Sequence, residues 1–131
     1  MLESEIIEKT KIEIDEELLT SSEEKGYTYL HCIYYTSPKW SGGWWVNIWK
    51  TSYLVCNGIK YPLIHAIDIP YAPQKHFLHY TGDSLKFTLI FPALPKECKT
   101  FDFIEECRGG RGLSARGIIR SESGIHKVRV S

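Results

Sequence analysis

The sequence predicts an all-β protein, folded as a two-sheet antiparallel β-sandwich of about seven to nine strands. Apolar residues recur mostly with a period of two, which is the side-chain period of a strand with one buried face. Aromatic and β-branched residues gather in short runs, as is typical of pleated, half-buried surfaces. Glycine and proline turn signals separate these runs at short intervals, which is the spacing of sandwiches and barrels.

The chain has 131 residues, a length that one hydrophobic core can organise. Hydrophobic residues make up 43% of it and charged residues 24%, so it can bury a core of ordinary size. We therefore expect a single domain over residues 1–131, in which residues 1–8 form a mobile N-terminus.

In the first part of the chain, strict alternation predicts an opening strand at Lys9–Asp15. Residues 16–26 form at most one helical turn before serine, glutamate and glycine turn them into a loop. The aromatic and β-branched run Tyr27–Thr36 predicts a central strand. A loop at residues 37–43 then leads to a strand at residues 44–50.

The middle of the chain carries a hairpin signal. Asn57-Gly58 lies between two apolar runs, and a type I′ turn requires positive φ at both of its central residues. The second run extends to Ala66 and contains Pro62, which must lie on an edge strand or at a bulge because it has no amide hydrogen. Residues 67–83 are expected to cross irregularly, with a short strand near Phe77–Tyr80.

The segment "PALPKECK" interrupts the most apolar part of the chain. Pro92 and Pro95 cannot continue a central ladder, so the chain must leave its sheet there. We interpret the segment as a corner between the two sheets, with Leu94 closing the end of the core. Phe87 and Phe103, which flank the corner, should then belong to different sheets.

Three strands complete the expected fold. One covers residues 99–105, and a glycine-rich turn follows it at residues 107–112. The last two strands, at residues 113–121 and 125–130, are joined through Ser123-Gly124.

The run from Phe87 to Glu105, a strand followed by Pro-x-Leu-Pro-Lys and a second strand that ends Asp-Phe-Ile-Glu, resembles small immunoglobulin-like domains of uncharacterised bacterial proteins. It is more distantly similar to telokin-like modules. The likeness extends over roughly residues 12–119, and the chain departs from the pattern at Cys98 and at Ala115-Arg116. The resemblance implies an immunoglobulin-like sandwich and no catalytic residue.

A tryptophan cluster in "WSGGWWVNIW" is the main candidate for a ligand-binding surface. In an extended strand Trp45, Asn47 and Trp49 share one face, and Trp40 lies just before them. If Val46 and the following isoleucine point into the core, the outward indoles form an aromatic platform that can stack a sugar ring or dock a partner. If the strand faces the other way, the tryptophans fill the core, and we favour this second arrangement.

The remaining motifs do not predict catalysis, a metal or a cofactor. His76 and His79 point to opposite faces of a strand, and Asp83 does not complete a convincing ligand set. The single "RGGRG" at residues 108–112 is interpreted as a hairpin turn. The sequence contains no nucleophile elbow, phosphate loop or zinc-protease motif.

Charge and cysteine usage limit the partners and the compartment. The net charge is zero, which argues against nucleic acid, but residues 1–25 carry nine acids and three lysines, and we expect the first and last strands to neutralise each other. No apolar window is long enough to span a membrane.

We favour four free thiols at Cys32, Cys56, Cys98 and Cys107, with a disulfide as the alternative if the protein is exported. No targeting signal is found, so the default compartment is the cytoplasm unless a leader has been removed.

These observations lead to a non-catalytic binding or protein-interaction module. A carbohydrate-binding module with the tryptophan platform is the alternative, and a small enzyme is a third option that no motif supports. A protein partner, a glycan and a second copy of the chain all remain open as partners.

Overall fold

The computed structural model describes residues 26–36, 44–106 and 112–131, and this part of the chain is all-β with no helix. The predicted strand Lys9–Asp15, the mobile N-terminus 1–8, the loop 37–43 and most of the glycine-rich turn lie outside the described residues. Within them, the strands are β1 Tyr27–Tyr35, β2 Trp44–Val46, β3 Tyr53–Cys56, β4 Ile59–Pro62, β5 His65–Ile67, β6 His76–Leu78, β7 Ser84–Pro92, β8 Thr100–Ile104, β9 Ser114–Ile119 and β10 Ile125–Val130.

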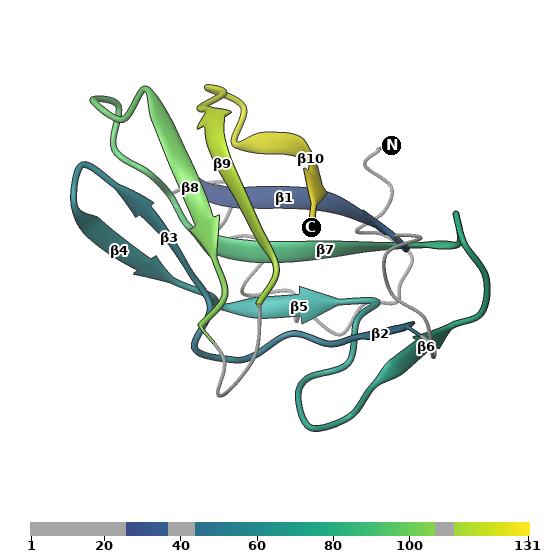
Figure 1. Cartoon of the computed structure of the whole chain (residues 1–131). Coiled ribbons are helices and arrows are strands. Elements are labelled where there is room, and N and C mark those ends of the chain that lie inside the picture. The colour runs from purple at the N-terminus through teal and green to yellow at the C-terminus, as the bar shows by residue number, and fades with distance from the viewer. Residues whose placement is uncertain (1–25, 37–43, 107–111) are drawn as a thin grey trace.

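Two four-stranded sheets make up the body of the fold (Figure 1). The first sheet has the order β10-β1-β7-β5, and the second sheet has the order β4-β3-β8-β9. A separate ribbon of β2 and β6, here called the β2–β6 ribbon, completes the pairing. Most pairs are antiparallel as predicted, but β1 and β10 pair in parallel.

The main core lies between the two sheets, which is the arrangement of a β-sandwich. Strands β1, β7 and β10 contribute one side, and β3 and β8 contribute the other. Phe91 of β7 meets Phe103 of β8 edge to face, with ring centroids 6.1 Å apart. Both rings are fully buried, so the contact ties the two layers together at the centre of the core.

The segment "PALPKECK" is a corner between the sheets, as predicted. Strand β7 ends at Pro92 in the first sheet, and β8 begins at Thr100 in the second. Leu94 packs partly buried against the core, and the Cys98 amide donates to the Pro95 carbonyl at 3.0 Å to close a turn. Phe87 and Phe103 therefore lie in different sheets.

The prediction of four free thiols is wrong for one pair, because Cys56 and Cys98 form a disulfide. Cys56 ends β3, and Cys98 lies in the proline corner, so the bond ties the corner to the second sheet. The sequence did not reveal the pair because the two cysteines are 42 positions apart and only the turn of the corner brings them together. Cys32 is a buried free thiol, and Cys107 lies outside the described residues.

The Asn57-Gly58 hairpin is confirmed, with φ of 52° and 80° at its two central residues. Pro62 ends β4 at the edge of the second sheet, where it costs no central ladder bond. The run expected to continue to Ala66 instead divides into two strands in different sheets. At the division, the Leu63 amide donates to Ser52 and the Ile64 amide donates to Ile90 of the first sheet. This unexpected second crossing makes the described strands more numerous than predicted.

Candidate functional site

The β2–β6 ribbon exposes two large aromatic side chains next to each other. Trp45 of β2 and Phe77 of β6 are cross-strand partners, and their exposed fractions are 48% and 57%. The Lys75 ammonium lies over the Trp45 ring, 4.5 Å from its centroid, which is the geometry of a cation–π contact. We call Trp45, Lys75 and Phe77 the aromatic patch.

Alternation along the short strands produces this patch. Val46, which follows Trp45, is buried in the core, and Leu78, which follows Phe77, is buried on the same side. Successive side chains of a strand point to opposite faces, so Trp45 and Phe77 must point away from the core. Trp45 therefore lies on the surface, and the prediction that the tryptophans fill the core is wrong for this residue.

Asn47 does not take part in an exposed platform. Strand β2 ends at Val46, so the alternation stops, and Asn47 is buried with an exposed fraction of 8%. Its Nδ2 donates to the Gln74 carbonyl at 2.8 Å, which fixes the loop before β6. The side-chain amide is therefore used to hold the structure and does not face a ligand beside Trp45.

The Trp49 side chain is partly buried, and its backbone amide is hydrogen-bonded to a side chain far away in the sequence. Its amide donates to Oε2 of Glu105 at 2.8 Å. Trp40 lies outside the described residues. Of the three predicted site residues that the structure describes, only Trp45 belongs to the aromatic patch. Its partners Lys75 and Phe77 come from residues 67–83, which were expected to cross irregularly with a short strand near Phe77–Tyr80.

Glu105 is a buried carboxylate whose two oxygens are both occupied. Oε2 accepts from Trp49, and Oε1 accepts from the Leu113 amide at 2.7 Å. Burial raises the pKa of Glu105, while the two backbone amides oppose that shift. By accepting these two backbone hydrogen bonds, the Glu105 carboxylate joins the loop between β2 and β3 to the start of β9. Because both of its oxygens are used in these bonds, it is not placed to act as a general base.

The histidine pair considered for a metal does not form a ligand cluster. His76 and His79 are exposed, and Asp83 accepts from the backbone amides of His79 and Ser84 at 3.0 Å and 2.9 Å. The His79 amide is the main reason that the pKa of Asp83 is lowered. In the described ranges, no group of three or more His, Cys, Asp or Glu side chains is arranged to hold a metal ion.

Cys32 is not a reactive thiol in this fold. Its side chain is buried between the sheets, and burial raises its pKa to about 12. The thiolate is the nucleophilic form of cysteine, so a raised pKa makes the side chain unreactive at neutral pH.

Comparison of the chain with protein-family models, curated proteins and solved structures finds no significant match. The described residues contain no apolar helix of the length needed to cross a membrane.

Proposed function

We propose that this chain is a non-catalytic, immunoglobulin-like interaction module that binds a protein partner through the aromatic patch. The observation that carries the proposal is the exposed cross-strand pair of Trp45 and Phe77. Two sheets packed face to face and joined by the proline corner support the immunoglobulin-like form of the sandwich.

The energetics of the patch favour a binding role. Burying a large apolar side chain that is now in water contributes about 1.5–3 kcal/mol. Tryptophan is among the residues that most often dominate the binding energy of protein interfaces. Val46 and Leu78 are buried in the core and hold the ribbon in place. The backbone that carries the Trp45 and Phe77 rings is therefore already ordered, and binding costs little conformational entropy.

A protein partner fits the patch better than a sugar. Carbohydrate sites combine an aromatic ring with polar groups that bond the hydroxyls, and the amide predicted for this role, that of Asn47, is buried and already bonded. Lys75 also covers one face of the Trp45 ring. Phe77, which has no hydrogen-bonding group, extends the patch as an apolar contact surface.

Carbohydrate binding is the second candidate. It is supported by the exposure of the Trp45 ring, on which a sugar can stack once Lys75 moves aside.

The disulfide bears on the compartment in which this module works. Structural disulfides persist in oxidising surroundings and are rare in the cytosol. The Cys56–Cys98 bond therefore favours export over the cytoplasmic default.

A comparison of three immobilised proteins tests the proposed function: the wild type, Trp45→Ser/Phe77→Ser, and the control Ile59→Ser. Ile59 is an equally exposed apolar residue on β4, away from the ribbon. Proteins of the source extract are quantified by mass spectrometry after capture. We expect a partner retained equally by the wild type and the control, and retained at least about tenfold less by the double variant.

Equal capture by all three proteins would contradict the assignment of the patch. A glycan array run with the same proteins separates the two candidates. A sugar that quenches tryptophan fluorescence in the wild type, but not in Trp45→Ser, would replace the protein-partner proposal with the carbohydrate one.

A further inference from the structure

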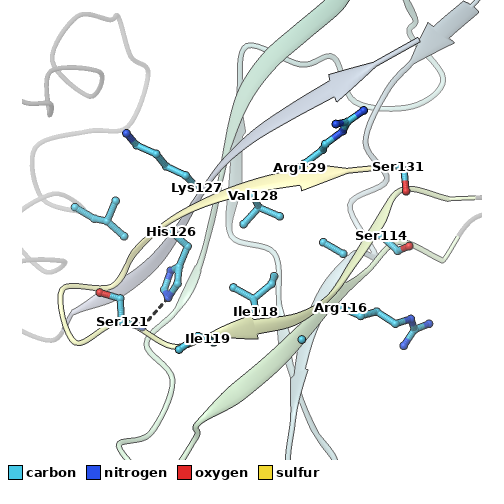
Figure 2. Close-up of a pocket in the computed structure, with 13 residues that line it drawn as sticks. Ser114, Arg116, Ile118, Ile119, Ser121, His126, Lys127, Val128, Arg129 and Ser131 are labelled. Atoms are coloured by element: carbon cyan, nitrogen blue, oxygen red, sulfur yellow. Dashed lines mark hydrogen bonds between the residues drawn. The ribbon is translucent and has the colours of Figure 1, made fainter. Parts of the chain in front are cut away.

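A groove separates the edge strands β9 and β10 (Figure 2). Each strand ends its own sheet, and the groove between them has a volume of about 740 Å³. At one end, the backbones of Ser114 and Ser131 exchange two hydrogen bonds, at 3.0 Å and 3.2 Å. At the other end, the Ser121 amide donates to Nε2 of His126 at 3.0 Å. The two edge strands are thus joined by hydrogen bonds at both ends of the groove and lie apart along its length.

The backbone of β10 presents groups to this groove that no other described strand pairs. In a parallel pair, alternate residues direct both their N–H and C=O groups to the same neighbour. Gly124 bonds Tyr29 of β1, whereas Ser131 bonds Ser114 on the other side. The alternation between these two points turns the amides and carbonyls of Ile125, Lys127 and Arg129 toward the groove. The Ile125 amide donates to Oγ of Ser123 at 3.1 Å, whereas within the described strands no ladder joins β9 to β10 at Lys127 and Arg129.

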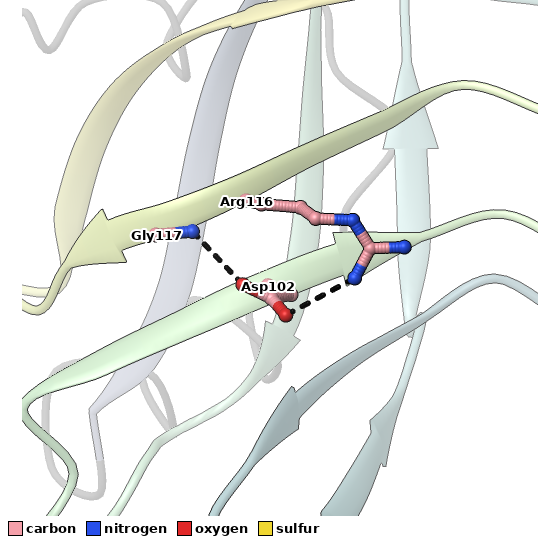
Figure 3. A network of polar contacts seen from close by, with 3 residues as sticks. All are labelled: Asp102, Arg116 and Gly117. Atoms are coloured by element: carbon pink, nitrogen blue, oxygen red, sulfur yellow. Dashed lines mark hydrogen bonds and ion pairs between the residues drawn. The ribbon is translucent and has the colours of Figure 1, made fainter.

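A bulge explains why β9 does not close onto β10. Between the pairs Phe101–Ile118 and Phe103–Ala115, two residues of β9 lie opposite the single residue Asp102. Asp102 accepts from the Gly117 amide at 2.8 Å and from the Arg116 guanidinium at 3.3 Å (Figure 3). Bulges bend the strand that carries them, and this one is held in place by Asp102.

The floor of the groove is apolar, and its rim is cationic. The side chains of Ile118 and Val128 face the space between the strands in Figure 2. Arg116, Lys127 and Arg129 stand on the rim, and none of the thirteen lining residues is acidic. Among the described residues Asp102 pairs with Arg116, and the charges of Lys127 and Arg129 have no acidic counterpart in the lining.

We propose that the β9–β10 groove binds an acidic, extended segment of a partner protein by adding it as a strand to the edge of β10. The N–H and C=O groups of Lys127 and Arg129, together with the Ile125 carbonyl, supply the main-chain ladder. Alternate side chains of an extended segment point to opposite faces, so its apolar residues lie over Val128 and Ile118 and its acidic residues meet Lys127 and Arg129. This surface is separate from the aromatic patch, and its occupant is selected by charge and by an alternating pattern.

The probe for this site is a short acetylated peptide that alternates glutamate with valine, and its control carries lysine in place of glutamate. Hydrogen exchange is measured on the full chain with and without each peptide. We expect the glutamate peptide to slow exchange at the amides of Lys127 and Arg129, and we expect the lysine peptide to leave them unchanged. Lys127→Glu/Arg129→Glu should weaken binding of the glutamate peptide by about tenfold or more.

A matched charge reversal controls for net charge. Lys60→Glu/Lys86→Glu makes the same change at exposed positions of β4 and β7, and it should leave the affinity within about twofold. Equal loss in both variants, or equal binding of the two peptides, would overturn the proposal.

Two other occupants of the groove are distinguished by the free protein. If the amides of Lys127 and Arg129 are already protected in the free monomer, another segment of this chain fills the groove and the proposal fails. If their protection and the sedimentation coefficient both rise with protein concentration, the occupant is a second copy, and the proposal fails in that case too.

Discussion

Glu105 shows how one side chain can hold together parts of the chain that are distant in sequence. Its carboxylate bonds the amides of Trp49 and Leu113, and its own amide donates to the Leu113 carbonyl at 3.1 Å. Gly112, which precedes Leu113, lies so close to the Glu105 carbonyl that a Cβ there would collide with it. The local backbone is thus built around this carboxylate, and Trp49 is positioned by it.

Replacing Glu105 tests this role at the scale of one residue. Glu105→Ala leaves two backbone amides without their acceptor, and a hydrogen bond to a charged group contributes about 1.5–3 kcal/mol. The burial cost of the charge is recovered, so we expect a net loss of about 2–4 kcal/mol in the free energy of unfolding, measured by urea denaturation. Glu106→Ala, at an exposed neighbour, should change it by less than about 1 kcal/mol.

His126 is the second residue whose surroundings determine its protonation. Nε2 accepts from the Ser121 amide, so the proton lies on Nδ1, which faces the Tyr29 carbonyl at 3.3 Å. The ring also packs edge to face on Phe101, with centroids 5.1 Å apart. Burial lowers the pKa of His126, and the charge of Arg120 adds to this shift.

The lowered pKa of His126 predicts a loss of stability in mild acid. Below about pH 6.5, the unfolded chain takes up a proton that the folded chain resists, so the free energy of unfolding falls as the pH falls toward the folded pKa. Protonation also removes the acceptor for Ser121. We expect His126→Gln, whose neutral amide can still accept, to lose less stability between about pH 7.5 and 5.5 than the wild type.

Protonation of two other side chains also changes the free energy of unfolding in this pH range, and their contributions must be separated from that of His126. Burial also lowers the pKa of His31, which adds to the loss in acid, whereas the raised pKa of Glu105 acts in the opposite direction. The Glu105 contribution is shared by the wild type and His126→Gln and cancels in the difference. The charge of His126 adds to the lowering of the His31 pKa, so that part of the His31 contribution belongs to the effect of His126→Gln. His79→Gln, at an exposed position, is the control, and identical pH profiles for the wild type and His126→Gln would refute the prediction.

At the scale of the elements, the sequence predicted those whose signals are local. Tyr27–Thr36, the Asn57-Gly58 turn and the apolar alternation of residues 85–91 each depend on neighbouring residues, and each predicted strand or turn is present. The proline corner was also predictable, because a proline has no amide hydrogen for a ladder.

Other elements depend on contacts that no local pattern contains. The crossing at Leu63 and Ile64 arises because consecutive amides bond opposite sheets, which an apolar run cannot indicate. The parallel pairing of β1 with β10 joins the two ends of the described chain. The aromatic patch was found only in part, because Phe77 becomes the neighbour of Trp45 through a pairing across 32 positions of sequence.

At the scale of the whole molecule, the fold is two sheets between which the chain crosses repeatedly. Crossings occur between β4 and β5, between β7 and β8, and between β9 and β10. The crossings between β4 and β5 and between β9 and β10 join edge strands of the two sheets, and the charged groove lies at the edges formed by β9 and β10. The Cys56–Cys98 bond fixes one of these crossings covalently.

The disulfide should therefore contribute a large share of the stability of the whole fold. For cysteines 42 positions apart, the chain-entropy estimate is about 4 kcal/mol, within the usual range for native disulfides. We expect Cys56→Ala/Cys98→Ala to lose about 2–4 kcal/mol in the free energy of unfolding, and we expect the wild type to lose a similar amount when dithiothreitol is added. The double variant should not respond to dithiothreitol, which controls for effects of the reductant elsewhere. Alkylation of the denatured, unreduced protein followed by peptide mapping should label Cys32 and leave Cys56 and Cys98 unlabelled. Labelling of both Cys56 and Cys98 in protein purified under oxidising conditions would show that the proline corner is held by packing alone.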